Sequence, residues 1–290
     1  MRTIIIVVSP KLTGITQGNR KLAISNRQST ITLLTDFGTQ DYFVGAMKGV
    51  ILSANPGATI IDLTHDIPPQ DIHAAAFNLL ATYRYFPAGT IHVAVVDPGV
   101  GSSRRPILVE CVEQMFVGPD NGMFSWICER EKRFTARHMT NESFFRHPKS
   151  RTFHGRDVFA PVAAALARGV SAEEMGPLID NLVELESLTP RRKDDGTLEG
   201  SVIHIDRFGN CITNFTTEHL ITARTRPGSL FINNHEVSSF REFFSEKQDA
   251  AESLFMISGS AGFIEIAAQN ASAASILKVG RGQPVLFRTR

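Results

Sequence analysis

An alternation of strand-like and helix-like segments between residues 30 and 96 is the feature that most constrains how this chain folds. Runs of aliphatic and β-branched residues at 31–35, 59–63 and 90–96 predict three strands. Between them, apolar residues recur at helical spacing over 41–54 and 71–83. Because a helix between two strands lets the chain cross over and pair in parallel, the pattern predicts βαβ units around a mainly parallel sheet.

Short polar side chains stand at the predicted helix starts, where they can accept hydrogen bonds from free backbone amides. We expect Asp41 to cap the first helix, Asp71 to mark the start of the second, and Asp157 to cap a third helix over 157–168. Gly169 suits the end of that third helix, since glycine adopts the left-handed conformation common there.

The second half of the chain has a different pattern. After a charged stretch with Pro and Gly at 189–196, helical periodicity mostly disappears and short strand patterns separated by turns follow. These predict an all-β barrel or sandwich. We therefore expect an α/β N-terminal domain with a mainly parallel sheet over 30–192, and a smaller all-β, barrel-like C-terminal domain over 193–290. Residues 1–29 lack a strong period and are predicted to form a poorly ordered N-terminal extension.

Composition narrows the classes of partner. The 30 Lys and Arg residues nearly balance the 29 Asp and Glu residues, which argues against a nucleic-acid-binding protein because such proteins carry a basic surface. No apolar run approaches the roughly 20 residues that span a bilayer, so we expect no membrane partner. The three cysteines form no paired or metal-binding pattern and favour a reducing, cytoplasmic location: Cys111, Cys128 and Cys211.

Polar residues follow two of the predicted strands, at the sheet edge where α/β proteins bind ligands. Asp36 follows the first strand and could bind sugar hydroxyls or a metal, or cap its own turn. Asp97 follows the third strand, and Pro98 and two glycines let the loop fold back so that Arg104 can pair with it. A purely structural salt bridge is the alternative. The glycines match no phosphate-binding pattern.

Two further clusters lie beyond these strands, at 118–122 and 153–157. The second contains His154, whose side chain titrates nearest neutral pH and so is a candidate for proton transfer. The possible metal ligands are Asp36, His65, Asp97, Asp120 and His154. Their spacing matches no known metal-binding pattern, so we expect no metal site.

In the β domain, Asp206, Phe208 and Asn210 lie close together in sequence. They offer a carboxylate, a ring that can stack on a base, and an amide that can pair with an adenine edge; a simple hairpin turn is the alternative. Ser260 lies in a loop of small residues, 258–262, whose backbone could approach a ligand or form only a tight turn.

Taken together and in order, these segments resemble the S-adenosyl-L-methionine (SAM) hydroxide adenosyltransferases, or SAM hydrolases, a family related to the SAM-dependent fluorinase and chlorinase. The resemblance covers residues 31 to 290. It rests on five motifs: Thr35-Asp36-Phe37-Gly38, Val96-Asp97-Pro98-Gly99-Val100-Gly101 with Arg104, Pro119-Asp120-Asn121-Gly122, Phe153-His154-Gly155-Arg156-Asp157 and Asp206-Arg207-Phe208-Gly209-Asn210.

The resemblance implies a reaction in which water splits SAM into adenosine and methionine, with SAM as substrate and no cofactor. It implies a homotrimer whose active sites lie between the N-terminal domain of one subunit and the C-terminal domain of its neighbour. It also implies roles for single residues. Asp97, Arg104 and His154 correspond to the catalytic triad, Asp36 to the ribose ligand, Asp206 to a contact with the methionine amine, Asn210 to an adenine contact and Phe208 to a ring beside adenosine; Ser260 is expected to bind substrate.

Three alternatives remain open from the sequence. A SAM-dependent halogenase is disfavoured, since the resemblance implies an extra loop for halogenases and residues 100–106 pass directly into the next strand. A metal-dependent phosphoesterase would use Asp36, Asp97, Asp120 and His154. A non-catalytic adenosine or SAM sensor would bind the same ligand without turnover.

Overall fold

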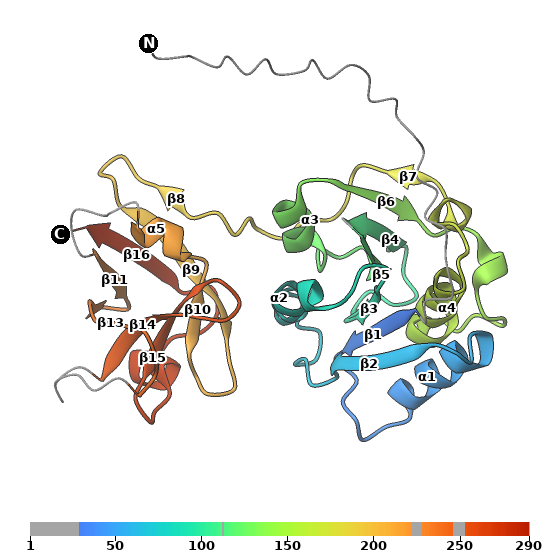
Figure 1. The fold of residues 1–290 in the computed structure, drawn as a ribbon, viewed down its shortest axis with the longest axis horizontal. Helices are drawn as coiled ribbons and strands as arrows, with labels where there is room; N and C mark the ends of the chain where they lie inside the picture. The colour runs from blue at the N-terminus through green and yellow to red at the C-terminus, as the bar shows by residue number, and fades with distance from the viewer. Residues whose placement is uncertain (1–28, 112, 222–227, 246–252, 290) are drawn as a thin grey trace, which may run out of the picture.

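The N-terminal domain is built on a seven-stranded sheet with the order β2-β1-β3-β5-β4-β6-β7 (Figure 1). The computed structural model describes residues 29–111, 113–221, 228–245 and 253–289, so the expected N-terminal extension lies, except for Ser29, outside the described residues. The strands are β1 (Thr30–Thr35), β2 (Thr59–Thr64), β3 (Ile91–Val95), β4 (Pro106–Cys111), β5 (Gln114–Pro119), β6 (Phe134–His138) and β7 (Leu178–Ile179).

Strands β2, β1, β3 and β5 run parallel, as the alternating pattern predicted. The remaining strands β4, β6 and β7 pair antiparallel. The connection between β4 and β5 is too short to hold a crossover helix, so these two strands form a hairpin. The start of β4 therefore lies beside the end of β5, a juxtaposition that matters for the site below.

Two helices cover each face of this sheet. Helices α1 (Phe43–Ala54) and α4 (Ala160–Ala167) contact each other, as do α2 (Ile72–Thr82) and α3 (Ser125–Glu131). Successive side chains of β1 point to opposite faces: Leu33 packs in the core with α1 and α4, and Leu34 in the core with α2 and α3. Each fully buried aliphatic side chain contributes about 1.5–3 kcal/mol, so the two cores fix the sheet between its helices.

The expected helix caps fare differently. Asp71 caps α2, its Oδ1 accepting a hydrogen bond from the Ala74 amide at 2.9 Å. The prediction for Asp41 is wrong, because α1 starts one residue after Tyr42 and no side chain caps it. The prediction for Asp157 is also wrong: it lies inside the π-helical turn η3 (Gly155–Phe159) that precedes α4. Its buried carboxylate binds Arg156, which takes the place of a capping interaction.

The C-terminal domain is a nine-stranded, curled sheet with the order β12-β11-β16-β9-β10-β15-β14-β13, and β8 also pairs with β9. All its pairs are antiparallel except β13 with β14. Strand β8, which a boundary at 192/193 assigns to the first domain, thus hydrogen-bonds to the second sheet. The fold class predicted from the sequence is confirmed. The strands are β8 (Arg191–Arg192), β9 (Leu198–Ile205), β10 (Cys211–Thr213), β11 (Gly228–Ile232), β12 (His235–Val237), β13 (Phe240–Arg241), β14 (Leu254–Ser258), β15 (Ile264–Ala268) and β16 (Pro284–Thr289).

Short helical segments complete the two domains. In the second domain, these are α5 (Thr217–Ile221) and α6 (Ala273–Leu277). In the first, they are η1 (Tyr83–Tyr85), η2 (Glu142–Phe144) and η4 (Ala172–Met175). No helix in the described ranges is long and apolar enough to span a membrane.

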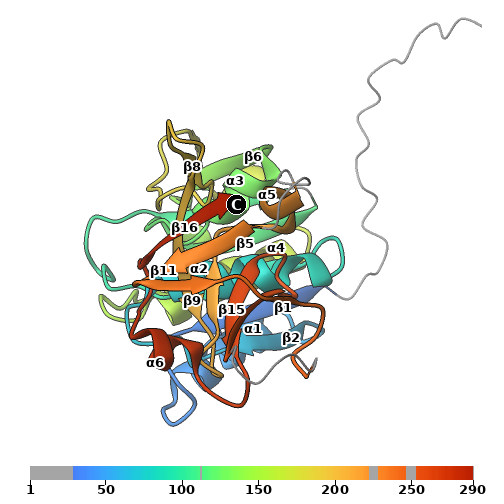
Figure 2. The same cartoon turned by 90° about the vertical axis from the view of Figure 1, so that its left-hand side faces the viewer.

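The two domains contact each other through α2 and β9. Figure 2 looks onto the C-terminal sheet with the N-terminal domain behind it. The Phe77 ring of α2 stacks on His204 of β9 with ring centroids 4.4 Å apart. Arg281 also donates to both carboxylate oxygens of Asp71, each at 2.6 Å. Apolar and charged contacts therefore hold one domain against the other.

Candidate active site

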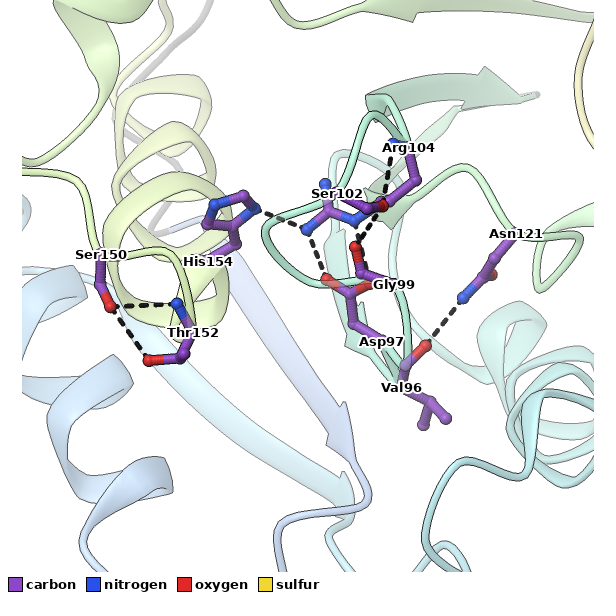
Figure 3. Close-up of polar contacts among 9 residues, drawn as sticks. All are labelled: Val96, Asp97, Gly99, Ser102, Arg104, Asn121, Ser150, Thr152 and His154. Atoms are coloured by element: carbon purple, nitrogen blue, oxygen red, sulfur yellow. Dashed lines mark hydrogen bonds and ion pairs between the residues drawn. The ribbon is translucent and has the colours of Figure 1, made fainter.

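Three of the predicted site residues meet at the carboxyl edge of the N-terminal sheet (Figure 3). Arg104 Nε donates to Asp97 Oδ1 at 2.9 Å, and Arg104 Nη2 donates to Asp97 Oδ2. The same Nη2 lies 2.7 Å from His154 Nδ1. One guanidinium group thus bridges a carboxylate from the end of β3 and an imidazole from the start of η3.

The loop between β3 and β4 folds back as the sequence predicted. Ser102 Oγ donates to the Gly99 carbonyl at 2.7 Å and accepts from the Arg104 amide at 3.2 Å, which stabilises the turn. Gly101 has a φ of +78°, and a Cβ there would overlap the carbonyl oxygen of Arg151. Only glycine fits this contact. The loop carrying Asp97 and Arg104 therefore lies against the backbone of the segment that leads to His154.

The electrostatics of the triad define the state of the histidine. The Asp97 and Arg104 side chains are only 6% and 10% exposed, so their ion pair is buried. A guanidinium group can only donate hydrogen bonds, so His154 Nδ1 must accept, and the neutral ring carries its proton on Nε2. Burial, together with the positive charge of Arg104, holds the pKa of His154 below its ordinary value.

One donor of the triad is left over. Arg104 Nη1 is buried and has no hydrogen-bond partner among the described residues. Leaving a buried charged donor unsatisfied costs free energy, which a ligand oxygen or a water molecule would recover. The triad therefore presents two donors, Arg104 Nη1 and His154 Nε2–H, together with the remaining lone pairs of Asp97.

Asp36 leaves the same sheet edge as Asp97, because Thr35 of β1 pairs with Val95 of β3. Its Oδ2 accepts from the Gln70 amide at 2.8 Å. His65 contacts Thr35, the residue before Asp36, with its Nδ1 2.9 Å from Thr35 Oγ1. Asp36 is therefore held in a fixed position while keeping acceptor capacity for a ligand hydroxyl.

Aromatic side chains join the loops that carry Asp36 and His154. The Phe153 ring meets Phe37 with centroids 6.0 Å apart and Phe43 with centroids 5.2 Å apart, both edge to face. Such pairs contribute about 0.5–1.5 kcal/mol beyond the area they bury. The first domain thus assembles all four of its predicted site residues around one edge.

The predicted residues of the second domain form their own cluster. Asp206 Oδ1 accepts from the amides of Phe208 and Asn210 at 2.9 and 2.8 Å, and Oδ2 accepts from Asn210 Nδ2 at 2.9 Å. The Phe208 ring is 78% exposed. Ser260 is exposed, and its carbonyl oxygen lies 3.5 Å from the Tyr85 hydroxyl. Within the described ranges, no hydrogen bond or ion pair joins this cluster to the triad.

Glu265 was missed by sequence reasoning. It lies on β15, and a Cβ at Gly259 would overlap its carboxylate, so it faces the 258–262 loop. Burial, with the nearby charge of Asp206, raises the pKa of Glu265. The signal available in the sequence was a single carboxylate in an otherwise apolar strand. Two carboxylates, Asp206 and Glu265, therefore face one region of the second domain.

The five possible metal ligands named from the sequence do not form a common cluster. Asp120 binds Arg105, and His65 contacts Thr35. In the part of the chain that the structure describes, no three His, Cys, Asp or Glu side chains are grouped in a way that could hold a metal ion.

Comparison with known proteins identifies the family. Models of the N-terminal and C-terminal domains of SAM hydroxide adenosyltransferases match residues 31–176 and 200–286. The chain belongs to the SAM hydroxide adenosyltransferase family. The two matched regions of this family member contain the triad and the Asp206 cluster, respectively.

Proteins named as SAM hydrolases match this SAM hydroxide adenosyltransferase family member over most of its length. A protein of Thermus thermophilus named (R)-S-adenosyl-L-methionine hydrolase is 36% identical over 88% of this chain and 98% of its own. A protein of the same name from Methanocaldococcus jannaschii is 36% identical over 86% of this chain and 92% of its own. A fluorinase of Actinoplanes sp. is 26% identical over 66% of this chain and 72% of its own. A crystal structure of an uncharacterized conserved protein from Thermotoga maritima superposes with a TM-score of 0.81, at 32% identity over 89% of this chain and 99% of that one.

Proposed function

We propose that this protein hydrolyses SAM to adenosine and L-methionine by attack of water or hydroxide at the ribose C5′ atom. The contact of Arg104 with both Asp97 and His154, at the ligand-binding edge of an α/β sheet, is the observation that carries the proposal. The relatives named as SAM hydrolases, which align with most of the chain, support it.

The reaction forms a C5′–O bond and breaks the C5′–S bond, whose electron pair leaves with sulfur to give a neutral thioether. A proton leaves the attacking water. The sulfonium cation and the developing hydroxide lose charge together as they react. A water-poor site favours this step, since neither partner keeps a full hydration shell.

Each triad residue has a role that follows from its hydrogen bonds. His154 Nδ1 is occupied by Arg104 and its Nε2 carries a proton, so His154 donates to the attacking water and orients it. Asp97 supplies the lone pair that accepts the proton. Arg104 holds both groups and offers Nη1 to the attacking oxygen.

The remaining residues would bind the substrate. Asp36 accepts from the ribose hydroxyls, and the exposed Phe208 ring stacks beside the adenosine. Asn210 uses one N–H on Asp206 and keeps its second N–H and its Oδ1 for the adenine edge. Asp206 and Glu265 contact the methionine ammonium, and Ser260 lies at the methionine end. No cofactor takes part, because SAM itself is the reactant.

We further propose a homotrimer in which the triad of one subunit meets the Asp206 cluster of its neighbour. The exposure of Phe208 supports this arrangement, because a stacking ring needs a second surface. Mixing Arg104→Ala subunits with Asp206→Ala subunits tests it. A shared site predicts partial recovery of activity in the mixed oligomer, whereas a site within one subunit predicts none. The three free, buried cysteines are consistent with our proposal of a cytoplasmic location.

Water is favoured over halide as the nucleophile. Residues 96–105 run directly from β3 to β4, which leaves no inserted loop like that expected of the halogenases. Chloride-dependent formation of 5′-chloro-5′-deoxyadenosine would contradict the proposal.

Product analysis of the purified protein with SAM tests the activity itself. We expect adenosine and methionine in equal amounts. Asp97→Ala, Arg104→Ala and His154→Ala should each bind SAM nearly as tightly as the wild type and turn it over more slowly. Wild-type rates in all three variants would refute the triad.

A further inference from the structure

The Pro119-Asp120-Asn121-Gly122 turn has no part in the proposed chemistry, although it lies beside the triad. It begins at Pro119, the last residue of β5, and the neighbours of β5 are β3 on one side and β4 on the other. Strand β3 is parallel to β5 and β4 is antiparallel, so the end of β3 and the start of β4 both lie at the end of β5. The loop that carries Asp97 and Arg104 begins and ends at these two points.

Two consecutive residues of the turn contact the two ends of that loop. Asn121 Nδ2 donates to the carbonyl of Val96, the residue before Asp97, at 2.8 Å (Figure 3). The Asp120 amide donates to the carbonyl of Arg105, the residue after Arg104, at 2.9 Å.

Side-chain contacts strengthen the second end. The Asp120 carboxylate is buried and accepts from Arg105 Nε at 2.8 Å and from Arg105 Nη2. Its Oδ1 accepts from the Val183 amide at 2.9 Å, and Arg105 Nη1 donates to Asn181 Oδ1 at 2.8 Å. The start of β4 is therefore joined both to the turn and to the segment that leads toward the second domain.

We propose that Asp120 and Asn121 are positioning residues for the reaction, which fix the two ends of the 96–105 loop and so set Asp97 and Arg104 in register with each other. This inference rests on the proposed function of the triad. Neither residue needs to touch substrate. Misplacing a reacting group by about 1 Å can cost about 100-fold in rate, so a loop held at both ends would keep Asp97 and Arg104 in the geometry that the reaction needs.

The substitution Asn121→Asp tests the proposal with little change in shape. In the wild-type protein, Asn121 Oδ1 accepts from the Met123 amide at 3.3 Å, and an aspartate keeps this acceptor. The substitution removes the Nδ2 donor to the Val96 carbonyl. Asn141→Asp is the matched control. Asn141 Oδ1 likewise accepts from the amide two residues on, Ser143, at 3.2 Å, and its Nδ2 donates to the Glu174 carbonyl at 2.9 Å. Both asparagines are half-buried.

We expect Asn121→Asp to lower kcat for SAM hydrolysis by at least about tenfold with KM within about threefold, and Asn141→Asp to leave both within about twofold. The midpoint temperature of thermal unfolding should shift to a similar extent in the two variants. Equal kcat values in the two variants would overturn the proposal. Asn121→Ser removes the donor without adding a charge, and it decides the question if Asn121→Asp does not fold.

A second measurement separates this inference from the proposed function. The ¹⁵N chemical shift of His154 Nδ1 reports its hydrogen bond from Arg104 and needs no turnover. It should move in Asn121→Asp and stay in place in Asn141→Asp; an unchanged shift in both overturns the positioning role. A wild-type protein that releases no adenosine would refute the proposed function, while the shift would still test the positioning of the loop.

Discussion

Replacing Asp97 with Asn tests the energetics of the triad most sharply, because it removes one charge and almost no volume. The Arg104–Asp97 contact at 2.9 Å corresponds to a Coulomb attraction of about 6 kcal/mol at an effective dielectric constant of about 20. Desolvation of both groups offsets much of this. Removing one partner of such a buried pair nevertheless costs about 3–5 kcal/mol, because the other charge stays buried and unpaired.

Asp97→Asn should therefore lower the free energy of unfolding by about 3 kcal/mol or more, since the Arg104 side chain is only 10% exposed. Arg104→Gln should cost a similar amount, and the double variant should cost far less than the sum. Urea unfolding at a fixed protein concentration, followed by circular dichroism, measures the three values. We expect a coupling free energy of about 2–4 kcal/mol. Additivity within about 0.5 kcal/mol would refute a buried, mutually dependent pair.

Three further predictions concern pH, backbone and metal dependence. Burial lowers the pKa of His92 from 6.5 to about 4, so the unfolded state takes up a proton at higher pH than the folded state does. The free energy of unfolding should therefore fall by about 2 kcal/mol as the pH is lowered from 7.5 to 5. His92→Gln should flatten this dependence on pH, and an unchanged dependence would contradict the prediction. Gly101→Ala should lower kcat by about tenfold or more, since the new Cβ overlaps the Arg151 carbonyl. Gly196→Ala is the control, because φ is also positive there and no atom lies near the new Cβ. Equal kcat values in the two variants would contradict a role for the loop contact. SAM turnover should be unchanged after dialysis against EDTA, and loss of activity restored by a divalent cation would support the metal-dependent alternative.

Much of the first domain could be predicted because its signals are local. The helical spacing between strands predicted the parallel strands, and Asp71 marked the start of the second helix, which it caps. Asp97 and Arg104 could be paired because Pro98 and the following glycines indicated a loop that folds back. The interacting residues of the cap and of the ion pair lie only 3 and 7 positions apart. The parallel pairing joins residues that are more distant, but the helical spacing between the strands signals it locally.

The remainder depends on contacts between residues distant in sequence. The Asn121–Val96 contact exists because β3 and β5 are neighbours in the sheet, which no local pattern specifies. Asp157 is an exception, because its carboxylate binds the adjacent Arg156 and the Ser150 amide and it lies within η3, where it does not cap a helix. Glu265 lies in a strand pattern and acquires significance only beside Asp206.

The central claim is that water attacks C5′ of SAM, and isotope transfer tests it most directly. The protein is incubated with SAM in ¹⁸O-water and the adenosine is analysed by mass spectrometry. We expect one ¹⁸O atom in the 5′-hydroxyl of the adenosine released. Unlabelled adenosine, or SAM recovered intact over many turnover times, would contradict the account.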